Sequence, residues 1–285
     1  MLDISIIIVN YNGKKTLAKC LDFAVNHKTK YKFEIILIDN NSQDDSIKII
    51  KRYKNKLKFI QNIKNHGFSY ANNQGIKIAR GAYLFFLNND AYLKESVIDK
   101  LTDYLKNNSK VGAVGPALLN IDNSPQYSGS ILGHWQYKKR SVSFVGFLSA
   151  AALLCPKKVI DMIGCFDENF FFYNEDVDLC KMIIKNGFKL AYYPFVQVIH
   201  HQGVSTTTRK EASIIEGFRG GLYLVKKHYP KIIFEIYRGL IIFLALLLAI
   251  YFKLSSTVFK KQKSNYNAYK KIFRIAYKGE LTIEK

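Results

Sequence analysis

One pattern repeats through the first 90 residues and restricts the fold more than any other feature of the sequence. A short apolar run rich in β-branched residues is followed by polar residues and then by a segment with helix-compatible spacing. Continuous apolar runs of this length are typical of strands buried on both faces. Repeated strand–helix units predict an α/β fold with a mostly parallel sheet and right-handed crossovers. The strand runs are 4–9, 33–38, 57–61 and 83–87, and the helical segments are 14–27, 46–54 and 68–79.

Polar side chains follow three of these predicted strands at the point where each strand ends. The carboxyl ends of parallel strands meet at one edge of a sheet, and ligands of such folds bind beyond that edge. We therefore expect these side chains to converge on one site. Asparagine and aspartate are also common in turns, so an ordinary turn explains each position taken alone. The residues are Asn10 and Tyr11, then Asp39, and then Asn88, Asn89 and Asp90.

A second polar cluster opens a predicted helix within residues 166–187. Asn174 suits the N-cap position, and Glu175, Asp176 and Asp178 follow in the first turn. Carboxylates there interact favourably with the helix dipole, which explains them without any function. The N–H groups of the same turn also keep a carboxylate ionised, and such a carboxylate beside a pocket can act as a general base. Both interpretations stay open on this segment alone.

A histidine pair, His200 and His201, follows the late apolar strand predicted at 196–199. A histidine at a strand end can bind a metal, although a lone pair of this kind is more often structural. Between the two polar clusters, residues 120–140 contain several Gly, Pro, Asn and Asp residues, which predict a surface loop.

The composition narrows the class of protein without fixing it. With 285 residues and 48% hydrophobic content, the chain is expected to fold around a core. Its net charge of +21 favours phosphates, nucleic acid or an anionic membrane as partners. The lysines are spread along the chain without the basic and aromatic clustering of a nucleic-acid-binding face, so we expect no nucleic acid partner. The four cysteines lack zinc-binding spacing and predict free thiols of a reducing compartment, and the N-terminus lacks the basic start of a signal peptide.

The C-terminal part carries an uninterrupted apolar run at 240–252, followed by a basic tail. As a helix, the run is about 20 Å long, against a hydrocarbon core of roughly 30 Å, so it is too short to span a bilayer by itself. Adding 253–259 reaches a marginal spanning length. Residues 253–285 contain nine Lys or Arg and two Glu, which favours an anionic membrane surface. A helix packed on its own domain, or in a homodimer interface, is the alternative.

Taken together, these segments resemble one family. The chain resembles the glycosyltransferase family 2 enzymes with the GT-A fold, and most of all bacterial rhamnosyltransferases of cell-surface polysaccharide assembly. The resemblance covers roughly residues 3–230, with the matching segments in the order and with the spacing of the family. These segments are 5–13, 38–46, 65–76, 85–90, 166–194 and 198–205.

The resemblance implies roles for individual residues. The D-x-D motif of the family falls on 88–90, so Asn88 is directed to the ribose, Asn89 acts as a spacer, and Asp90 is the metal ligand. Asn88 replaces the usual first carboxylate and adds no charge at a metal. Because Mg²⁺ keeps waters and uses substrate phosphates, one protein carboxylate is tolerable. The other implied residues are Asn10, Tyr11 and Asp39 for the nucleotide, Asn65, Gly67 and Asn73 beside the donor, His200 as the second metal ligand, and Asp176 next to Glu175 as the catalytic base.

The expected protein is an inverting transferase that uses a nucleotide-sugar donor, with dTDP-rhamnose as the first choice, and Mg²⁺ or Mn²⁺. Its acceptor would be a glycan or lipid-linked glycan at the cytoplasmic face of the membrane. Residues 1–230 would form the GT-A domain and 231–285 the membrane-associating helix and tail. A nucleic-acid-binding protein or a non-catalytic membrane scaffold is the competing class. A sugar nucleotidyltransferase would share the fold but would need a glycine-rich loop after the first strand, where this chain has one glycine, Gly13.

Overall fold

The computed structural model describes residues 2–127, 137–201, 210–256 and 262–282. Contacts between residues divide the chain into two compact units. Unit 1 comprises Met1–Asp167 and Asp176–Ser205, and unit 2 comprises Glu168–Glu175 and Thr206–Lys285. This division differs from the boundary expected at residue 230, because a helix before that residue and a short segment ahead of Asp176 both pack within unit 2.

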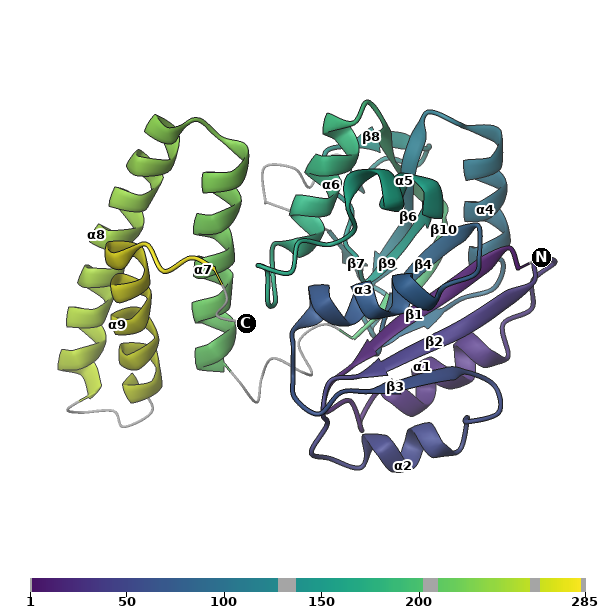
Figure 1. Ribbon diagram of the computed structural model, residues 1–285, viewed down its shortest axis with the longest axis horizontal. Coiled ribbons are helices and arrows are strands. Elements are labelled where there is room, and N and C mark those ends of the chain that lie inside the picture. Colours follow the sequence, from purple (N-terminus) through teal and green to yellow (C-terminus); the bar gives the residue numbers. More distant parts are fainter. Residues whose placement is uncertain (1, 128–136, 202–209, 257–261, 283–285) are drawn as a thin grey trace. The chain divides into compact units, whose positions relative to one another are not determined.

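Unit 1 is built on one mixed sheet with the strand order β3-β2-β1-β4-β9-β6-β10-β5 (Figure 1). The first four strands are parallel to one another, and β6 is parallel to β10. The antiparallel β9 lies between β4 and β6, and β5 is antiparallel to β10. The α/β fold predicted from the sequence is confirmed, and its sheet is mixed. β1 to β4, β6 and β10 share one direction, and β5, β7, β8 and β9 run against it. The strands are β1 (Ile4–Asn10), β2 (Phe33–Asp39), β3 (Lys58–Gln61), β4 (Tyr83–Asn88), β5 (Ala91–Leu93), β6 (Val111–Leu119), β7 (Pro125–Gln126), β8 (Ser143–Val145), β9 (Ala152–Pro156) and β10 (Lys189–His200).

Helices cover both faces of this sheet and bury a separate apolar core on each. Side chains of β1 alternate between the two cores, with Ile6 and Ile8 in one and Ile7 and Val9 in the other. This alternation is the period-2 geometry of a strand buried on both sides. The first core is covered by α1 (Leu17–Val25), α2 (Ser46–Lys51) and α4 (Val97–Asn107), and the second by α3 (Phe68–Ile78), α5 (Lys157–Ile163) and α6 (Glu175–Lys185).

Strand register brings the polar strand ends together. In the parallel ladders, Asn10 pairs with Asp39, and Val9 pairs with Asn88. The three strands therefore end at the same level, and the residues that follow them lie at one edge of the sheet. The convergence predicted from the sequence follows directly from this register.

Unit 2 consists of α7 (Lys210–His228), α8 (Lys231–Ser256) and α9 (Lys263–Lys278), together with the segment Glu168–Glu175. Its core includes Leu222 from α7, Ile241 and Ala245 from α8, and Ile272 from α9. Within the described part of the chain, α8 is the one helix long and apolar enough to cross a membrane, with a mean hydropathy of 2.3 over its most apolar window. Its 26 residues give a length of about 39 Å, longer than expected because the helix starts before the apolar run.

Candidate active site

The ends of β1 and β2 are joined by a buried hydrogen-bond network. Asn10 donates from Nδ2 to Asp39 Oδ1 at 2.7 Å, and Ser42 donates from Oγ to the same oxygen at 2.6 Å. The backbone N–H of Ser42 donates to Asp39 Oδ2 at 2.8 Å. Asn10 and Asp39 are fully buried. These bonds hold the Asp39 carboxylate in one orientation at the sheet edge, and Ser42 is a contributor that the sequence did not indicate.

The network extends to the turn after β4 through Asn89. Its Nδ2 donates to Asn10 Oδ1 at 2.7 Å, and its side chain is buried. The sequence predicted Asn89 as a spacer, but in the structure its side chain ties the 88–90 turn to β1. Gly13 makes this contact possible, because a Cβ there would lie 2.2 Å from Asn10 Oδ1 and 2.4 Å from Asn89 Nδ2.

The residues predicted beside the donor make local bonds that shape the edge of α3. Asn65 Oδ1 accepts from the backbone N–H of Gly67 at 2.9 Å. Gly67 has a φ of 89° and accepts at its carbonyl from Asn40 Nδ2 at 2.9 Å. The Asn73 amide exchanges two bonds with the backbone of Phe166, at 2.9 and 3.0 Å. These contacts give all three residues a structural role, and their part in donor binding stays a prediction.

Asp90 and His200 meet at the same sheet edge although 110 residues separate them in the chain. His200 Nε2 lies 3.3 Å from Asp90 Oδ1, and both side chains are nine-tenths buried. The two side chains meet because β10 runs antiparallel to β5, which places His200 opposite Ala91. The backbone N–H of His201 also donates to the backbone oxygen of Asp90 at 2.9 Å. Asn88 Nδ2 lies 3.3 Å from the same imidazole nitrogen. Asn88 therefore faces the histidine, and the ribose contact that the family resemblance implied for it stays a prediction.

This pair offers one carboxylate oxygen and one imidazole nitrogen, a donor set that suits a divalent cation. Within the described residues, no third His, Cys, Asp or Glu side chain joins them into a larger metal-binding group. A cation held here would therefore have free coordination positions for substrate phosphates and water. The family resemblance implied that Asp90 and His200 share the cation, and metal binding by this pair stays a prediction.

Asp176 opens α6 as predicted, in the first turn after Asn174. Its Oδ1 accepts from the backbone N–H of Val177 at 2.9 Å, and the N–H of Ala150 also stabilises the ionised form. Burial outweighs these bonds and raises the pKa of Asp176 to about 6. A carboxylate with this pKa is ionised at neutral pH and still basic enough to accept a proton, which suits a general base. Glu175 and Asp178 beside it are buried.

The segment before Asp176 belongs to unit 2 and has an unusual backbone. Tyr173 and Asn174 both adopt positive φ, at 71° and 70°. Asn174 donates from Nδ2 to Gly217 O of α7 at 3.1 Å. A Cβ on Gly220 of α7 would lie 2.9 Å from that amide nitrogen and 3.0 Å from Tyr173 O. Close packing on two glycines of α7 thus supports two consecutive left-handed residues, a conformation that is otherwise unfavourable.

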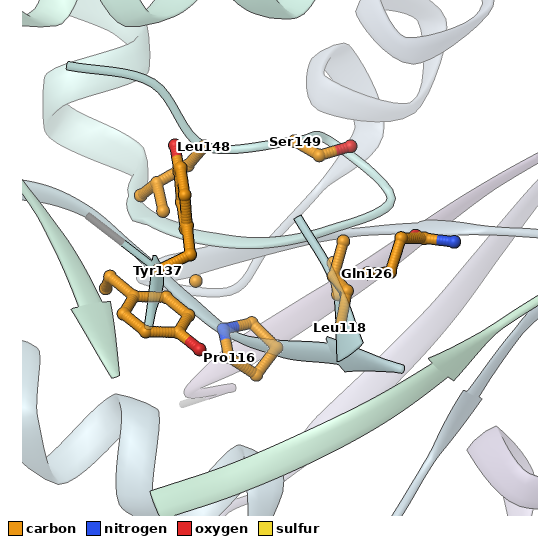
Figure 2. Close-up of a pocket in the computed structure, with 9 residues that line it drawn as sticks. Pro116, Leu118, Gln126, Tyr137, Leu148 and Ser149 are labelled. Carbon is orange, nitrogen blue, oxygen red and sulfur yellow. The ribbon is translucent and has the colours of Figure 1, made fainter. Parts of the chain in front are cut away.

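A pocket lies beside the end of β6, and Figure 2 shows the side chains that line it. Its volume is about 10 Å³, room for roughly one water molecule. Leu148 and Ser149 on its wall directly precede Ala150, whose N–H reaches Asp176. Tyr137 also lines the pocket. Burial raises the pKa of the Tyr137 hydroxyl most, and the nearby Cys180 and Asp176 raise it further, which places Tyr137 close to Asp176. The pocket therefore adjoins the candidate base. The remaining lining residues are Gly115, Pro116, Leu118, Gln126, Ala152 and Tyr192.

The loop predicted over 120–140 contains β7, and its residues 128–136 lie outside the described residues, as do 202–205 of the matching segment 198–205. Tyr11 follows β1 and is half-buried. The cysteines are free, as expected, with Cys165 partly exposed and the others buried.

Solved structures share this architecture and define its class. The crystal structure of GalNAc-T7 with UDP, GalNAc and Mn²⁺ superposes with a TM-score of 0.61 at 17% identity, covering 79% of this chain and 48% of that one. The mannosyltransferase PcManGT from Pyrobaculum calidifontis, in complex with GDP-Man and Mn²⁺, gives 0.61 at 13% identity and covers 96% of this chain and 85% of its own. The fold of unit 1 is the GT-A fold.

The family follows from the sequence comparison. The model of glycosyl transferase family 2 matches residues 5–166, and the chain belongs to that family. Its relatives include glycosyltransferases, an L-rhamnosyltransferase among them. It is 26% identical over 237 residues to the N-acetylglucosaminyl-diphospho-decaprenol L-rhamnosyltransferase of Mycobacterium tuberculosis, covering 70% of this chain and 76% of the relative. It is also 26% identical over 223 residues to the O-antigen biosynthesis protein RfbC of Myxococcus xanthus, of which the match spans only 17%.

Proposed function

We propose that this chain is an inverting, cation-dependent glycosyltransferase that builds a cell-surface glycan from a nucleotide-sugar donor, with dTDP-rhamnose the first candidate. The single observation that supports this most is the meeting of Asp90 and His200, at 3.3 Å, on the sheet edge where Asn10 and Asp39 also end. In this arrangement a nucleotide and a cation on its diphosphate would bind next to each other at the carboxyl ends of the strands.

Asp90 and His200 would hold Mg²⁺ or Mn²⁺, which would neutralise negative charge on the departing diphosphate. Asn10, Tyr11 and Asp39 would bind the base and ribose, with Asn88 and Asn89 completing the floor between them and the cation. The edge formed by Asn65, Gly67 and Asn73 would border the donor. The Asn89–Asn10 hydrogen bond would link the nucleotide end of this site to the turn that carries Asp90.

Asp176 would serve as the general base. It takes the proton of the acceptor hydroxyl while the hydroxyl oxygen bonds to the anomeric carbon. The bond from that carbon to the diphosphate oxygen breaks, and the diphosphate leaves with the electron pair. Attack from the opposite face inverts the anomeric centre in one displacement. A raised pKa of about 6 fits this role, and Glu175 adds a second acidic side chain at the start of the same helix.

The acceptor would reach Asp176 from the side of the pocket beside β6 (Figure 2). The relative from Mycobacterium tuberculosis is named for a diphospho-decaprenol acceptor, and this supports a lipid-linked acceptor here. A donor screen tests the proposal: sugar nucleotides, beginning with dTDP-rhamnose, are assayed for donor turnover with Mg²⁺ or Mn²⁺ and with EDTA. Cation-dependent turnover of at least one donor supports it, whereas full activity in EDTA contradicts the cation-dependent mechanism.

We place the protein at an anionic membrane surface, because α8 carries a continuous apolar stripe. At 100° per residue, its exposed large apolar side chains fall on one side of the helix, while Phe234, Ile241 and Ala245 face the core of unit 2. The exposed residues are Ile232, Ile233, Ile236, Leu240, Phe243, Leu244, Leu246, Leu247, Ile250, Tyr251 and Leu254.

The position of α9 favours a helix that lies in the membrane interface over one that spans. Arg238 of α8 donates from Nε to Ala276 O at 2.7 Å and from Nη2 to Tyr277 O at 2.9 Å, while Phe252 stacks on Tyr269. The two helices therefore run antiparallel along most of the apolar stretch. If α8 crossed the bilayer, the exposed basic side chains of α9 would enter the hydrocarbon, at about 2.5–3.5 kcal/mol each near its centre. In the interface, the same side chains meet anionic headgroups. These side chains are Lys270, Lys271 and Arg274.

A further inference from the structure

A row of polar side chains connects the loop before β7 to the ring of His200. The row begins at Asp122 and passes through Ser124 and Asn120 to Gln126, which is the last residue of β7. Gln126 Oε1 lies 2.7 Å from His200 Nδ1. All of these contacts lie within unit 1, and the sequence did not indicate any of the four residues as functional.

The direction of each hydrogen bond in this row is fixed from its far end. The Asp122 carboxylate only accepts, so the single hydroxyl proton of Ser124 points to it, at 2.6 Å. Ser124 Oγ must then accept from Asn120, which places the Asn120 amide nitrogen on that side, at 2.9 Å. Asn120 therefore turns its carbonyl oxygen to the next residue.

Two acceptors then orient the side-chain amide of Gln126. Its Nε2 lies 3.0 Å from Asn120 Oδ1 and 3.4 Å from the backbone carbonyl oxygen of His200, which can only accept. The amide nitrogen must face these two oxygens, and this turns Oε1 toward the imidazole. Because an amide oxygen cannot donate, the hydrogen in the 2.7 Å contact belongs to Nδ1 of His200.

We propose that Gln126 is a positioning residue that holds His200 in the Nδ1–H tautomer and thereby presents the Nε2 lone pair to the cation site at Asp90. The inference rests on the proposed function for the cation itself. The opposite tautomer would point an N–H at Asp90 and occupy the position that a metal ion needs. A hydrogen bond to the far nitrogen is the usual way in which a protein sets the tautomer of a metal-binding histidine.

The first experiment reads the tautomer without any metal. Ring ¹⁵N shifts of His200 are measured at pH 8 in the full-length, metal-free protein labelled on histidine, and the signals are assigned by their loss in His200→Ala. We expect the Nδ1–H form in the native chain and in Gln126→Glu, which keeps an acceptor at Nδ1. In Gln126→Leu we expect a mixture of tautomers. Gln197→Leu on the same strand is the matched control and should keep the native signals, because Gln197 bonds to Lys94 at the surface.

The second experiment measures Mn²⁺ affinity of the same variants by calorimetry. We expect Gln126→Leu to bind Mn²⁺ about 10- to 100-fold more weakly and Gln197→Leu to match the native protein. An Nε2–H ring in the native chain, or an unchanged tautomer in Gln126→Leu, overturns the inference. So does a changed tautomer with unchanged Mn²⁺ affinity. If Asp90→Ala binds Mn²⁺ as well as the native chain does, the proposed cation site is wrong, and the role of Gln126 toward the cation is rejected with it. The ¹⁵N shifts still show in that case whether Gln126 sets the tautomer of His200.

Discussion

Replacing Gly13 with alanine is a direct test of whether the polar strand ends form one connected site. The new Cβ would lie 2.2 Å from Asn10 Oδ1 and 2.4 Å from Asn89 Nδ2, distances that real contacts do not reach. Asn10 and Asn89 must therefore separate, which breaks their 2.7 Å bond and turns Asn10 away from Asp39. One neutral bond and one bond to a carboxylate are lost, so we expect Gly13→Ala to lower the free energy of unfolding by about 2–3 kcal/mol.

The same substitution should weaken nucleotide binding, because it displaces the side chain that holds the Asp39 carboxylate. Loss of one hydrogen bond of about 1.4 kcal/mol predicts a tenfold rise in Kd for the nucleotide diphosphate. Chemical unfolding followed by circular dichroism gives the stability change, and titration calorimetry gives the affinity. Gly146→Ala is the matched control, since a Cβ at that exposed glycine meets nothing within 4 Å. We expect this control to stay within about 0.5 kcal/mol of the native protein.

A double substitution separates a steric cause from a general effect of alanine in this loop. If the clash with Asn89 matters, Asn89→Ala should cost less stability in the Gly13→Ala background than in the native chain. Gly13→Ala with native stability and native nucleotide affinity would refute the connected site. Fully additive effects of the two substitutions would show that Gly13 and Asn89 do not oppose each other as the geometry requires.

Four further predictions concern the chemistry and the membrane surface. Asp176→Asn should abolish transfer while leaving nucleotide affinity near native, and near-native turnover would remove Asp176 from the mechanism. Because the pKa of Asp176 is raised to about 6, kcat/KM should rise with pH through about 6 to a plateau as the carboxylate ionises, and a profile flat from pH 5 to 8 would contradict this. Asp90→Ala should eliminate stimulation by Mg²⁺ or Mn²⁺, measured as turnover with and without EDTA, and retained stimulation would reject the ligand. Leu240→Glu combined with Leu247→Glu on the exposed stripe of α8 should reduce sedimentation with anionic vesicles, and unchanged sedimentation would argue against an embedded stripe.

The sheet edge was predictable because its causes are local. β-branched runs marked the strands, and chain direction placed Asn10, Asp39 and Asp90 after their carboxyl ends. The parallel register then aligned these residues as expected. The approach of His200 to Asp90 came only from the family resemblance, because no local pattern reports that β10 runs antiparallel to β5. The three residues of β5 are too few to show a periodic signal.

Two other features were missed for different physical reasons. Gln126 lies on a two-residue strand inside a segment that reads as a loop, and its importance depends on bonds to Asn120 and His200 that no spacing encodes. The length of α8 was underestimated because Lys231, Glu235 and Arg238 interrupt the apolar run, although the apolar residues between them keep the helical period. An uninterrupted run marks apolar content, whereas the length of a helix depends on where its backbone bonds begin.

The segment Glu168–Glu175 has a practical consequence for any shortened form of the protein. It packs with α7, through Asn174 and Gly217, and it ends one peptide bond before Asp176. A chain cut after residue 205 would keep every residue assigned here to the nucleotide, cation and base. It would nevertheless lose the support for the two left-handed residues that lead into α6. Shortened chains that lack α7, α8 and α9 should therefore bind nucleotide normally but have a low kcat. The cause of that low rate would be the lost packing of residues 173 and 174, and not the absence of a membrane.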